Sequence, residues 1–140
     1  MSDRFFLDTN VLVYAHDAGS PEKKTRSQEI VFGCLRNRSG VVSAQVLSEF
    51  FVTVTRKVER PMEPERAKRE ILLLSALETV EIDATLVVEA VNLKLRWQLG
   101  YWDALILAAA ERAGCHTVYS EDMSNGQVYG SLTVRNPYAN

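Results

Sequence analysis

Residues 4–16 read RFFLDTNVLVYAH, an apolar run that passes directly into a helical pattern. The run from Arg4 to Asp8 predicts a strand that is buried on both faces. The segment from Thr9 to His16 predicts a short helix. Asp8 therefore stands where the first strand ends, and α/β sheets bind their ligands at the carboxyl ends of their strands.

Strands and helices continue to alternate along the rest of the chain. We expect further strands at 41–43, 80–82, 117–119 and 132–134, the last of them at an edge of the sheet. We expect helices over 21–38, 44–59, from 64 onward, 85–99 and 102–113, with Gly40 closing the first of these. The helix at 102–113 is apolar on nearly every face and is expected to be central. This alternation predicts an α/β fold, a three-layer α/β/α sandwich around a mostly parallel sheet, in one domain spanning residues 1–140.

Composition excludes several classes of protein. The 140 residues are 46% hydrophobic with a net charge of −2, so the chain is neither disordered nor a polycation, and nucleic-acid binding would need a local patch. The longest apolar run, 104–110, is too short to span a bilayer. Asp8 and Asn10 interrupt the only N-terminal apolar stretch, so no signal peptide is expected. Two cysteines, Cys34 and Cys115, cannot form a disulfide framework, which favours a cytoplasmic protein without a zinc site.

Three aspartates stand where strands end or where a buried helix begins. Asp8 ends the first strand, Asp103 opens the most apolar helix, and Asp122 follows the fourth strand. Each of them alone could be an ordinary helix cap or turn residue. In a parallel sheet, however, all three would lie at the same edge, where Glu49 could lean in from a neighbouring helix.

Glu49 is the least distinctive of these acids. On a helical wheel it lies with Gln45 and Arg56 opposite an apolar stripe, which is typical of a solvated side chain. Four carboxylates that face one cleft would raise each other's pKa unless a cation compensates them. Oxygen donors without His or Cys suit Mg²⁺ or Mn²⁺, and such an ion can activate water and neutralise a phosphodiester. This pattern is typical of metal-dependent nucleases.

Four short motifs also give the chain a family resemblance. The segments FLDTNVLVYA (6–15), SEF (48–50), WDALI (102–106) and SED (120–122) occur in an order that resembles PIN-domain ribonucleases. The similarity is greatest to the VapC-type toxins of bacterial toxin–antitoxin pairs, and it runs from residue 4 to about residue 135. It implies a PIN-like fold and a Mg²⁺- or Mn²⁺-dependent endoribonuclease whose products carry 5′-phosphate and 3′-hydroxyl ends.

The resemblance also implies roles for particular acids. Its acidic site corresponds to Asp8, Glu49, Asp103 and Asp122 in this chain. Asp8, Asp103 and Asp122 would bind one or two metal ions. Glu49 would be a further ligand or the base for the attacking water.

Three more residues of these motifs are candidates for the site. Asn10 and Ser120 would be supporting groups that position a carboxylate or a water molecule. Glu121 lies directly beside Asp122 and could replace it as the functional acid. The motif favours Asp122, but the sequence does not separate the two.

The partners implied by the resemblance are an RNA substrate, a second copy of the chain and a protein antitoxin that reaches into the cleft. Apolar faces between residues 50 and 77 could serve a homodimer or the core equally well. Candidate contacts to the RNA backbone are Lys23, Lys24, Arg26, Arg56 and Lys57, all of which could instead be solvated helix charges. Tyr14, Tyr101 and Trp102 could stack on bases, although Trp102 is expected to pack in the core.

Two other functions remain open at this point. An aspartyl-phosphate phosphatase also places an Asp at the end of its first strand, but it needs a second Asp two positions later, where this chain has Asn10. A binding module of the same fold, for RNA or for protein, would need no catalytic acids. The complete acidic set argues against such a module, and Mn²⁺ binding would discriminate between the two.

Overall fold

The computed structural model describes residues 3–139, and at its centre is a six-stranded sheet. The strand order is β3 (Glu78–Val80), β2 (Gly40–Ser43), β1 (Phe5–Leu7), β4 (Thr117–Tyr119), β6 (Leu132–Arg135) and β5 (Val128–Tyr129). Neighbouring strands are parallel except in the β5–β6 hairpin. The prediction of a mostly parallel sheet is therefore confirmed.

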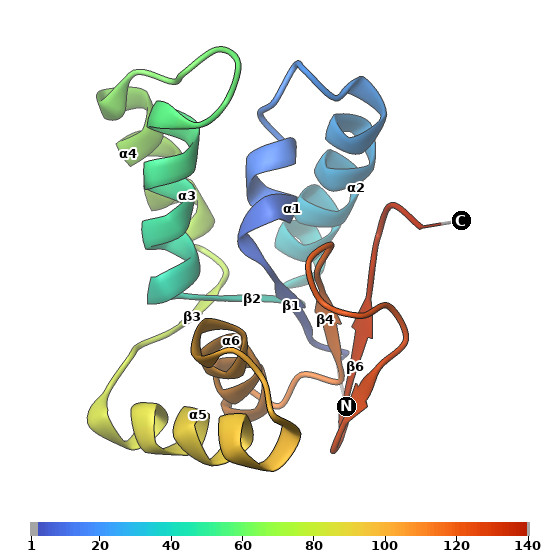
Figure 1. Ribbon diagram of the computed structural model, residues 1–140. Coiled ribbons are helices and arrows are strands. Elements are labelled where there is room, and N and C mark those ends of the chain that lie inside the picture. The colour runs from blue at the N-terminus through green and yellow to red at the C-terminus, as the bar shows by residue number, and fades with distance from the viewer. Residues whose placement is uncertain (1–2, 140) are drawn as a thin grey trace.

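Helices cover both faces of this sheet. They are α1 (Thr9–Tyr14), α2 (Pro21–Asn37), α3 (Ala44–Arg56), α4 (Pro64–Leu74), α5 (Ala84–Trp97) and α6 (Tyr101–Arg112). Figure 1 shows α5 and α6 below the strands and α1 to α4 above them. This arrangement confirms the three-layer α/β/α sandwich.

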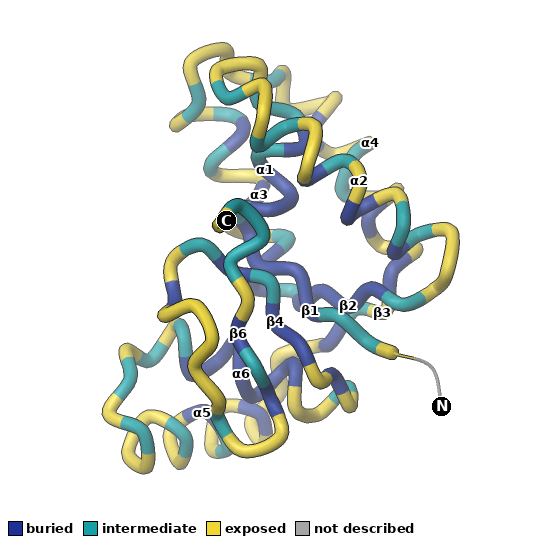
Figure 2. The backbone as a smooth tube through the Cα atoms, turned by 90° about the vertical axis from the view of Figure 1, so that its right-hand side faces the viewer, coloured by how far each residue is buried: buried dark blue, intermediate teal, exposed yellow. Residues whose placement is uncertain are grey.

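The hydrophobic core contains helix α6 and the central strands of the sheet. Every residue from Ala104 to Ala110 is buried, so α6 packs as the central helix that its apolar sequence predicts. Figure 2 shows buried backbone running through β1, β2, β4 and α6.

Cys34 and Cys115 are both buried and unpaired. Among the helices of residues 3–139, none combines the length and apolarity that crossing a membrane requires.

The end of α2 differs from the prediction. Gly40 does not close this helix, because Arg38 takes the left-handed conformation, with φ of 54°, and caps it instead. Gly40 begins β2, and a β-carbon there would lie 2.7 Å from Cys34 Cβ and 2.8 Å from Leu77 Cδ2. Close packing, not a helix stop, therefore accounts for this glycine.

Two predictions about the strands are wrong in detail. The third strand occupies 78–80 instead of 80–82, because its register opposite β2 pairs Val80 with Ser43 and leaves Ile82 outside the sheet, 40% exposed. The segment at 132–134 is not an edge strand, since the two-residue β5 lies beyond it and pairs with it antiparallel.

Serine and aspartate caps begin the helices that follow two of the strands. Ser43 Oγ accepts a hydrogen bond from the Val46 amide at 3.2 Å and so begins α3 directly after β2. Asp83 accepts one from the Leu86 amide at 2.8 Å and begins α5 in the same way. The cap at Ser43 places the first two turns of α3, which carry Glu49, at the carboxyl edge of the sheet.

Candidate metal-dependent active site

A cavity of about 370 Å³ opens where β1 and β4 end and where α3 and α6 begin. All four acids expected from the sequence line this cavity, namely Asp8, Glu49, Asp103 and Asp122. They come from four separate parts of the chain, since one follows β1, one lies on α3, one begins α6 and one follows β4. The fold therefore brings together residues that are up to 114 positions apart in the sequence.

Asp8 is both a helix cap and a member of the acidic group. Its side chain is only 4% exposed; Oδ1 accepts a hydrogen bond from the Thr9 amide and Oδ2 one from Ser120 Oγ, each at 2.7 Å. Burial raises the pKa of Asp8 to about 6, although these two hydrogen bonds oppose the shift. The charges of Asp122 and Glu49 contribute to this rise. The helix-cap role and the site role therefore belong to the same side chain.

The first turn of α1 connects Asp8 to two other acids. Thr9 Oγ1 donates a hydrogen bond to Glu49 Oε1 at 2.8 Å, and Asn10 Nδ2 donates one to Asp122 Oδ2 at 2.9 Å. Of the three residues that follow β1, Asp8 is itself one of the acids, and Thr9 and Asn10 each donate a hydrogen bond to another. The expected supporting position of Asn10 agrees with this geometry, and Thr9 is a supporting residue that the sequence reasoning missed.

Asp103 lies in the first turn of α6 and is partly buried. Within residues 3–139 its carboxylate has no hydrogen-bond or ion-pair partner. Burial raises the pKa of Asp103, and the charge of Asp122 raises it further. Asp103 is therefore a charged group without a partner of its own.

The structure separates Glu121 from Asp122. Ser120 Oγ, which donates to Asp8, also accepts a hydrogen bond from the Asp122 amide at 3.2 Å. The Glu121 side chain instead forms an ion pair with Lys23, outside the cavity lining. This geometry favours Asp122 over Glu121 as the acid of the site. Lys23, in turn, is already paired with Glu121.

No Lys, Arg or His among residues 3–139 forms an ion pair with any of the four carboxylates, although Lys57 lines the same cavity. Within that part of the chain, no three His, Cys, Asp or Glu side chains stand close enough together to enclose a metal ion. The donors are nevertheless all hard oxygen atoms, and two of the acids have raised pKa values that a cation would lower. This donor set fits Mg²⁺ or Mn²⁺.

Two further cavity residues differ from their expected environments. Trp102 is not a core residue but is 64% exposed, because the first turn of α6 extends beyond the packed part of that helix. Gln45 is not solvated alongside Glu49 but only 6% exposed, and its Nε2 donates a hydrogen bond to the Trp102 carbonyl at 3.3 Å. The position of Gln45 one helical turn before Glu49 is the only sequence signal that could have found it.

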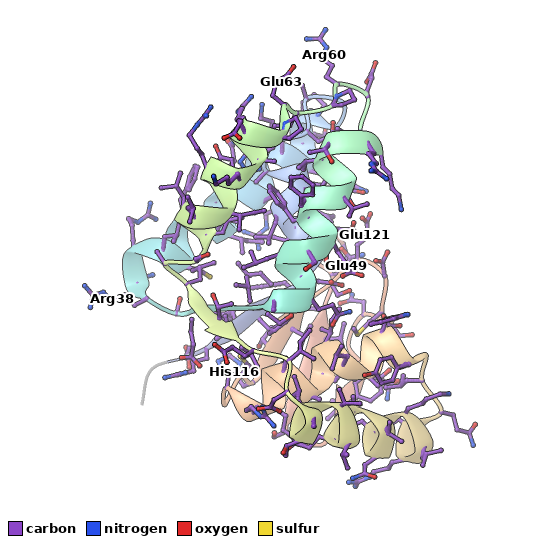
Figure 3. The ribbon with its side chains drawn as sticks, turned by 90° about the vertical axis from the view of Figure 1, so that its left-hand side faces the viewer. Arg38, Glu49, Arg60, Glu63, His116 and Glu121 are labelled. Atoms are coloured by element: carbon purple, nitrogen blue, oxygen red, sulfur yellow. The ribbon has the colours of Figure 1, made fainter. Side chains whose placement is uncertain are left out.

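At the amino ends of the strands, opposite this acidic cavity, acidic side chains lie beside basic ones. Figure 3 shows Glu49 on α3 well apart from His116, which precedes β4 at the other edge of the sheet. His116 Nε2 lies 3.3 Å from Asp3, and Arg4 pairs with Glu78. Asp3 and Glu78 thus have basic partners at this edge, whereas the four acids of the cavity have none among residues 3–139.

Comparison with known proteins identifies relatives of this arrangement. The PIN domain family model matches residues 5–125. A toxin–antitoxin complex from Klebsiella pneumoniae is similar in structure at 18% identity, covering 98% of this chain and 98% of that chain with a TM-score of 0.70. No curated protein matches the chain.

Two other solved structures have the same fold. VapC20 of Mycobacterium tuberculosis, described as a sarcin-ricin loop cleaving toxin, has 19% identity, coverage of 84% and 89%, and a TM-score of 0.67. VapBC2 from Rickettsia felis, solved on a DNA fragment from its promoter, has 20% identity, coverage of 94% and 97%, and a TM-score of 0.65. These similarities show a shared fold over nearly the whole chain.

Proposed function

The chain belongs to the PIN domain family, and from this premise we propose that it is a metal-dependent endoribonuclease that hydrolyses RNA phosphodiester bonds. One observation carries the proposal: four carboxylates line one cavity at the carboxyl edge of the sheet, and none is paired with a cation among residues 3–139. A protein that only bound RNA would gain nothing from four negative charges facing a polyanion.

Asp8, Asp103 and Asp122 are the proposed ligands of Mg²⁺ or Mn²⁺. Such an ion, when bound, would lower the pKa of water and neutralise charge on the phosphodiester. The protein itself orients two of these ligands through hydrogen bonds. Ser120 and the Thr9 amide orient Asp8, while Asn10 orients Asp122.

Glu49 has a different proposed role. It is exposed and lines the cavity, Thr9 Oγ1 donates a hydrogen bond to its Oε1, and its second carboxylate oxygen has no partner among the described residues. Such a group can accept a proton from an attacking water molecule or join the ligand set. Because Glu49 forms no ion pair among residues 3–139, it is available for either role when substrate is bound.

We also propose that the chain is the toxin of a toxin–antitoxin pair and that it forms a homodimer. The similar structures include a toxin–antitoxin complex from Klebsiella pneumoniae and the toxin VapC20, which supports the first point. Exposed apolar side chains on α3 and α4, including Phe51, Leu72 and Leu73, offer surfaces for protein partners.

Expression should arrest growth, and co-expression of the neighbouring reading frame should relieve the arrest. Light scattering should give twice the chain mass, whereas a monomer at micromolar concentration would contradict the dimer.

Cleavage of a mixed RNA pool by the purified protein tests the nuclease. We expect cutting with Mn²⁺, none with a chelator, and loss of cutting in Asp8→Asn. Glu78→Gln, which removes a carboxylate at the opposite edge of the sheet, is the matched control and should cut normally. Absence of both cutting and Mn²⁺ binding would overturn the proposal and favour a binding module. A covalent phosphate adduct on Asp8 would instead favour the phosphatase.

A further inference from the structure

Trp102 is a large aromatic side chain that the fold leaves uncovered at the wall of the acidic cavity. Its indole is 64% exposed, and it immediately precedes Asp103. The Tyr101 ring meets it edge-on, with 5.1 Å between ring centroids. Trp97, by contrast, is packed edge-on against Tyr129, and its side chain is partly buried. The exposed indole therefore presents an aromatic surface beside one of the proposed metal ligands.

Gln45 supplies the second observation. Its side chain is only 6% exposed and lines the same cavity, and its Nε2 donates to the Trp102 carbonyl. Its Oε1 is the one buried side-chain oxygen or nitrogen among residues 3–139 that has no hydrogen-bond partner. Exchanging the two amide atoms would not help, since the oxygen would then face the Trp102 carbonyl. A buried acceptor that lacks a donor destabilises the protein, so a ligand N–H group that reached Gln45 Oε1 from the cavity would relieve that cost.

The two residues stand at one end of a longer surface. Gln45 and Glu49 line the cavity from α3 and Lys57 from its C-cap, and a separation of 12 residues corresponds to about 18 Å along a helix axis. Glu49 therefore lies between Gln45 and Lys57, which is an exposed cation. A nucleic-acid strand along this surface would place a base at one end and a phosphate at the other.

We infer that Trp102 and Gln45 form a subsite for one unpaired RNA base next to the scissile phosphate. Trp102 would stack on the face of the base, and Gln45 Oε1 would accept a hydrogen bond from an N–H group on its edge. This inference rests on the proposed nuclease function and adds to it a position that binds one unpaired base. In a duplex, the base faces are covered by stacking and the edges are engaged in pairing, so neither contact can form.

Fluorescence of Trp102 tests the stacking directly. Trp97→Phe leaves Trp102 as the sole tryptophan, and adding Asp8→Asn allows RNA to bind without being cut. A short single-stranded RNA of mixed sequence, added with Mg²⁺, should quench this emission, whereas the same RNA annealed to its complement should not. Trp102→Ala should weaken single-strand binding roughly tenfold, and Trp102→Phe should restore much of it.

Gln45→Leu tests the hydrogen bond while nearly keeping the side-chain volume. We expect RNA binding to weaken by about tenfold while the melting temperature stays the same or rises, because the unpaired acceptor is gone. Leu95→Ala, which trims an exposed side chain outside the cavity, is the control and should bind RNA normally. A lower melting temperature with unchanged RNA binding would assign Gln45 a structural role and overturn its part in the subsite.

Failure of the subsite and failure of the nuclease give different results. Wild-type cleavage together with RNA binding that leaves Trp102 emission unchanged would overturn the subsite and retain the nuclease. Equal affinity for single-stranded and duplex RNA would do the same. Absence of cleavage and of any RNA binding would overturn both.

Discussion

The two ends of the strands differ in how their acids are partnered. At the amino edge, Glu78 pairs with Arg4, and Asp3 lies 3.3 Å from His116 Nε2, so both acids have basic partners. At the carboxyl edge, four acids line one cavity without an ion-pair partner among residues 3–139, and the most buried of them, Asp8, has its pKa raised to about 6. Exposed pairs of the first kind contribute little to stability, whereas like charges of the second kind oppose folding.

This contrast shows where the chain departs from what stability alone would favour. A fold selected only for stability would place cations near Asp8 and Asp103, as it does at the amino edge. The carboxyl edge instead holds its acids in place with neutral donors from Ser120, Asn10 and Thr9. Neutral donors orient a carboxylate without cancelling its charge, which leaves the site ready for a cation.

The largest expected effect separates two adjacent acids. Asp122→Asn removes a proposed ligand and should lower RNA cleavage by more than about 100-fold. This is a larger loss of activity than removal of a residue that only supports a ligand should cause. Glu121→Gln removes the neighbouring carboxylate, which is paired with Lys23, and should change cleavage by no more than about threefold. Initial rates with Mn²⁺ measure both variants. Equal losses would contradict the assignment of Asp122.

A smaller effect is expected from the hydroxyl that supports two acids. Ser120→Ala removes the donor to Asp8 Oδ2 and the acceptor of the Asp122 amide, so Mn²⁺ affinity should fall by about 10–100-fold. The pKa of Asp8 should also rise, since Ser120 lowers it. Ser75→Ala on an exposed helix end is the control and should leave Mn²⁺ affinity unchanged. An unchanged affinity in Ser120→Ala would show that this hydroxyl does not position the site.

The buried charge of Asp8 should be visible as a pH-dependent stability. Its pKa is about 6 in the folded chain against 3.8 for the ordinary group, so the folded state holds the proton more tightly. The free energy of unfolding should therefore fall as pH rises from about 4 to about 6, by on the order of 3 kcal/mol.

Asp8→Asn removes this destabilisation from the metal-free protein. In chelator at pH 7.5 the variant should be about 1–3 kcal/mol more stable than the wild type, and the difference should vanish near pH 4. Urea unfolding at both pH values measures it. A less stable variant at pH 7.5, or a difference that does not depend on pH, would contradict the proposed state of Asp8.

The smallest effect belongs to the amino edge. The side chains of Arg4 and Glu78 are 42% and 46% exposed, and a double-mutant cycle of Arg4→Met and Glu78→Gln should give a coupling of about 0.2–1 kcal/mol. RNA cleavage should not change in any of these variants. A coupling above 2 kcal/mol, or a loss of cleavage, would remove the functional contrast between the two edges.

Local patterns in the sequence were sufficient for much of the fold. The strand at 117–119 is confirmed at both ends because a glycine precedes it and its apolar residues are buried, and Pro21 and Pro64 begin their helices as predicted. The two-residue β5 could not be predicted, since its pairing depends on β6 and not on its own side chains. The register of β3 was likewise set by β2, which no local pattern reveals.

The candidate site divides in the same way. The sequence indicated Asp8, Asp103 and Asp122 because each stands at a strand end or a helix start, positions that the topology brings together. Glu49 lies further along its helix and was indicated by the position of that helix and by the family resemblance. It did not reveal the exposure of Trp102 or the burial of Gln45, since both depend on how far α6 extends past its packed turns. It also could not separate Glu121 from Asp122, because only the tertiary structure places Lys23 beside the former.

Calorimetric titration with Mn²⁺ at pH 7.5 is the most direct test of the contrast between the two edges. The wild type and Glu78→Gln should bind the ion with the same affinity, whereas Asp8→Asn and Asp103→Asn should bind it at least about tenfold more weakly. Absence of binding in the folded wild type, or equal binding in all four proteins, would contradict the claim that the carboxyl edge is a cation site.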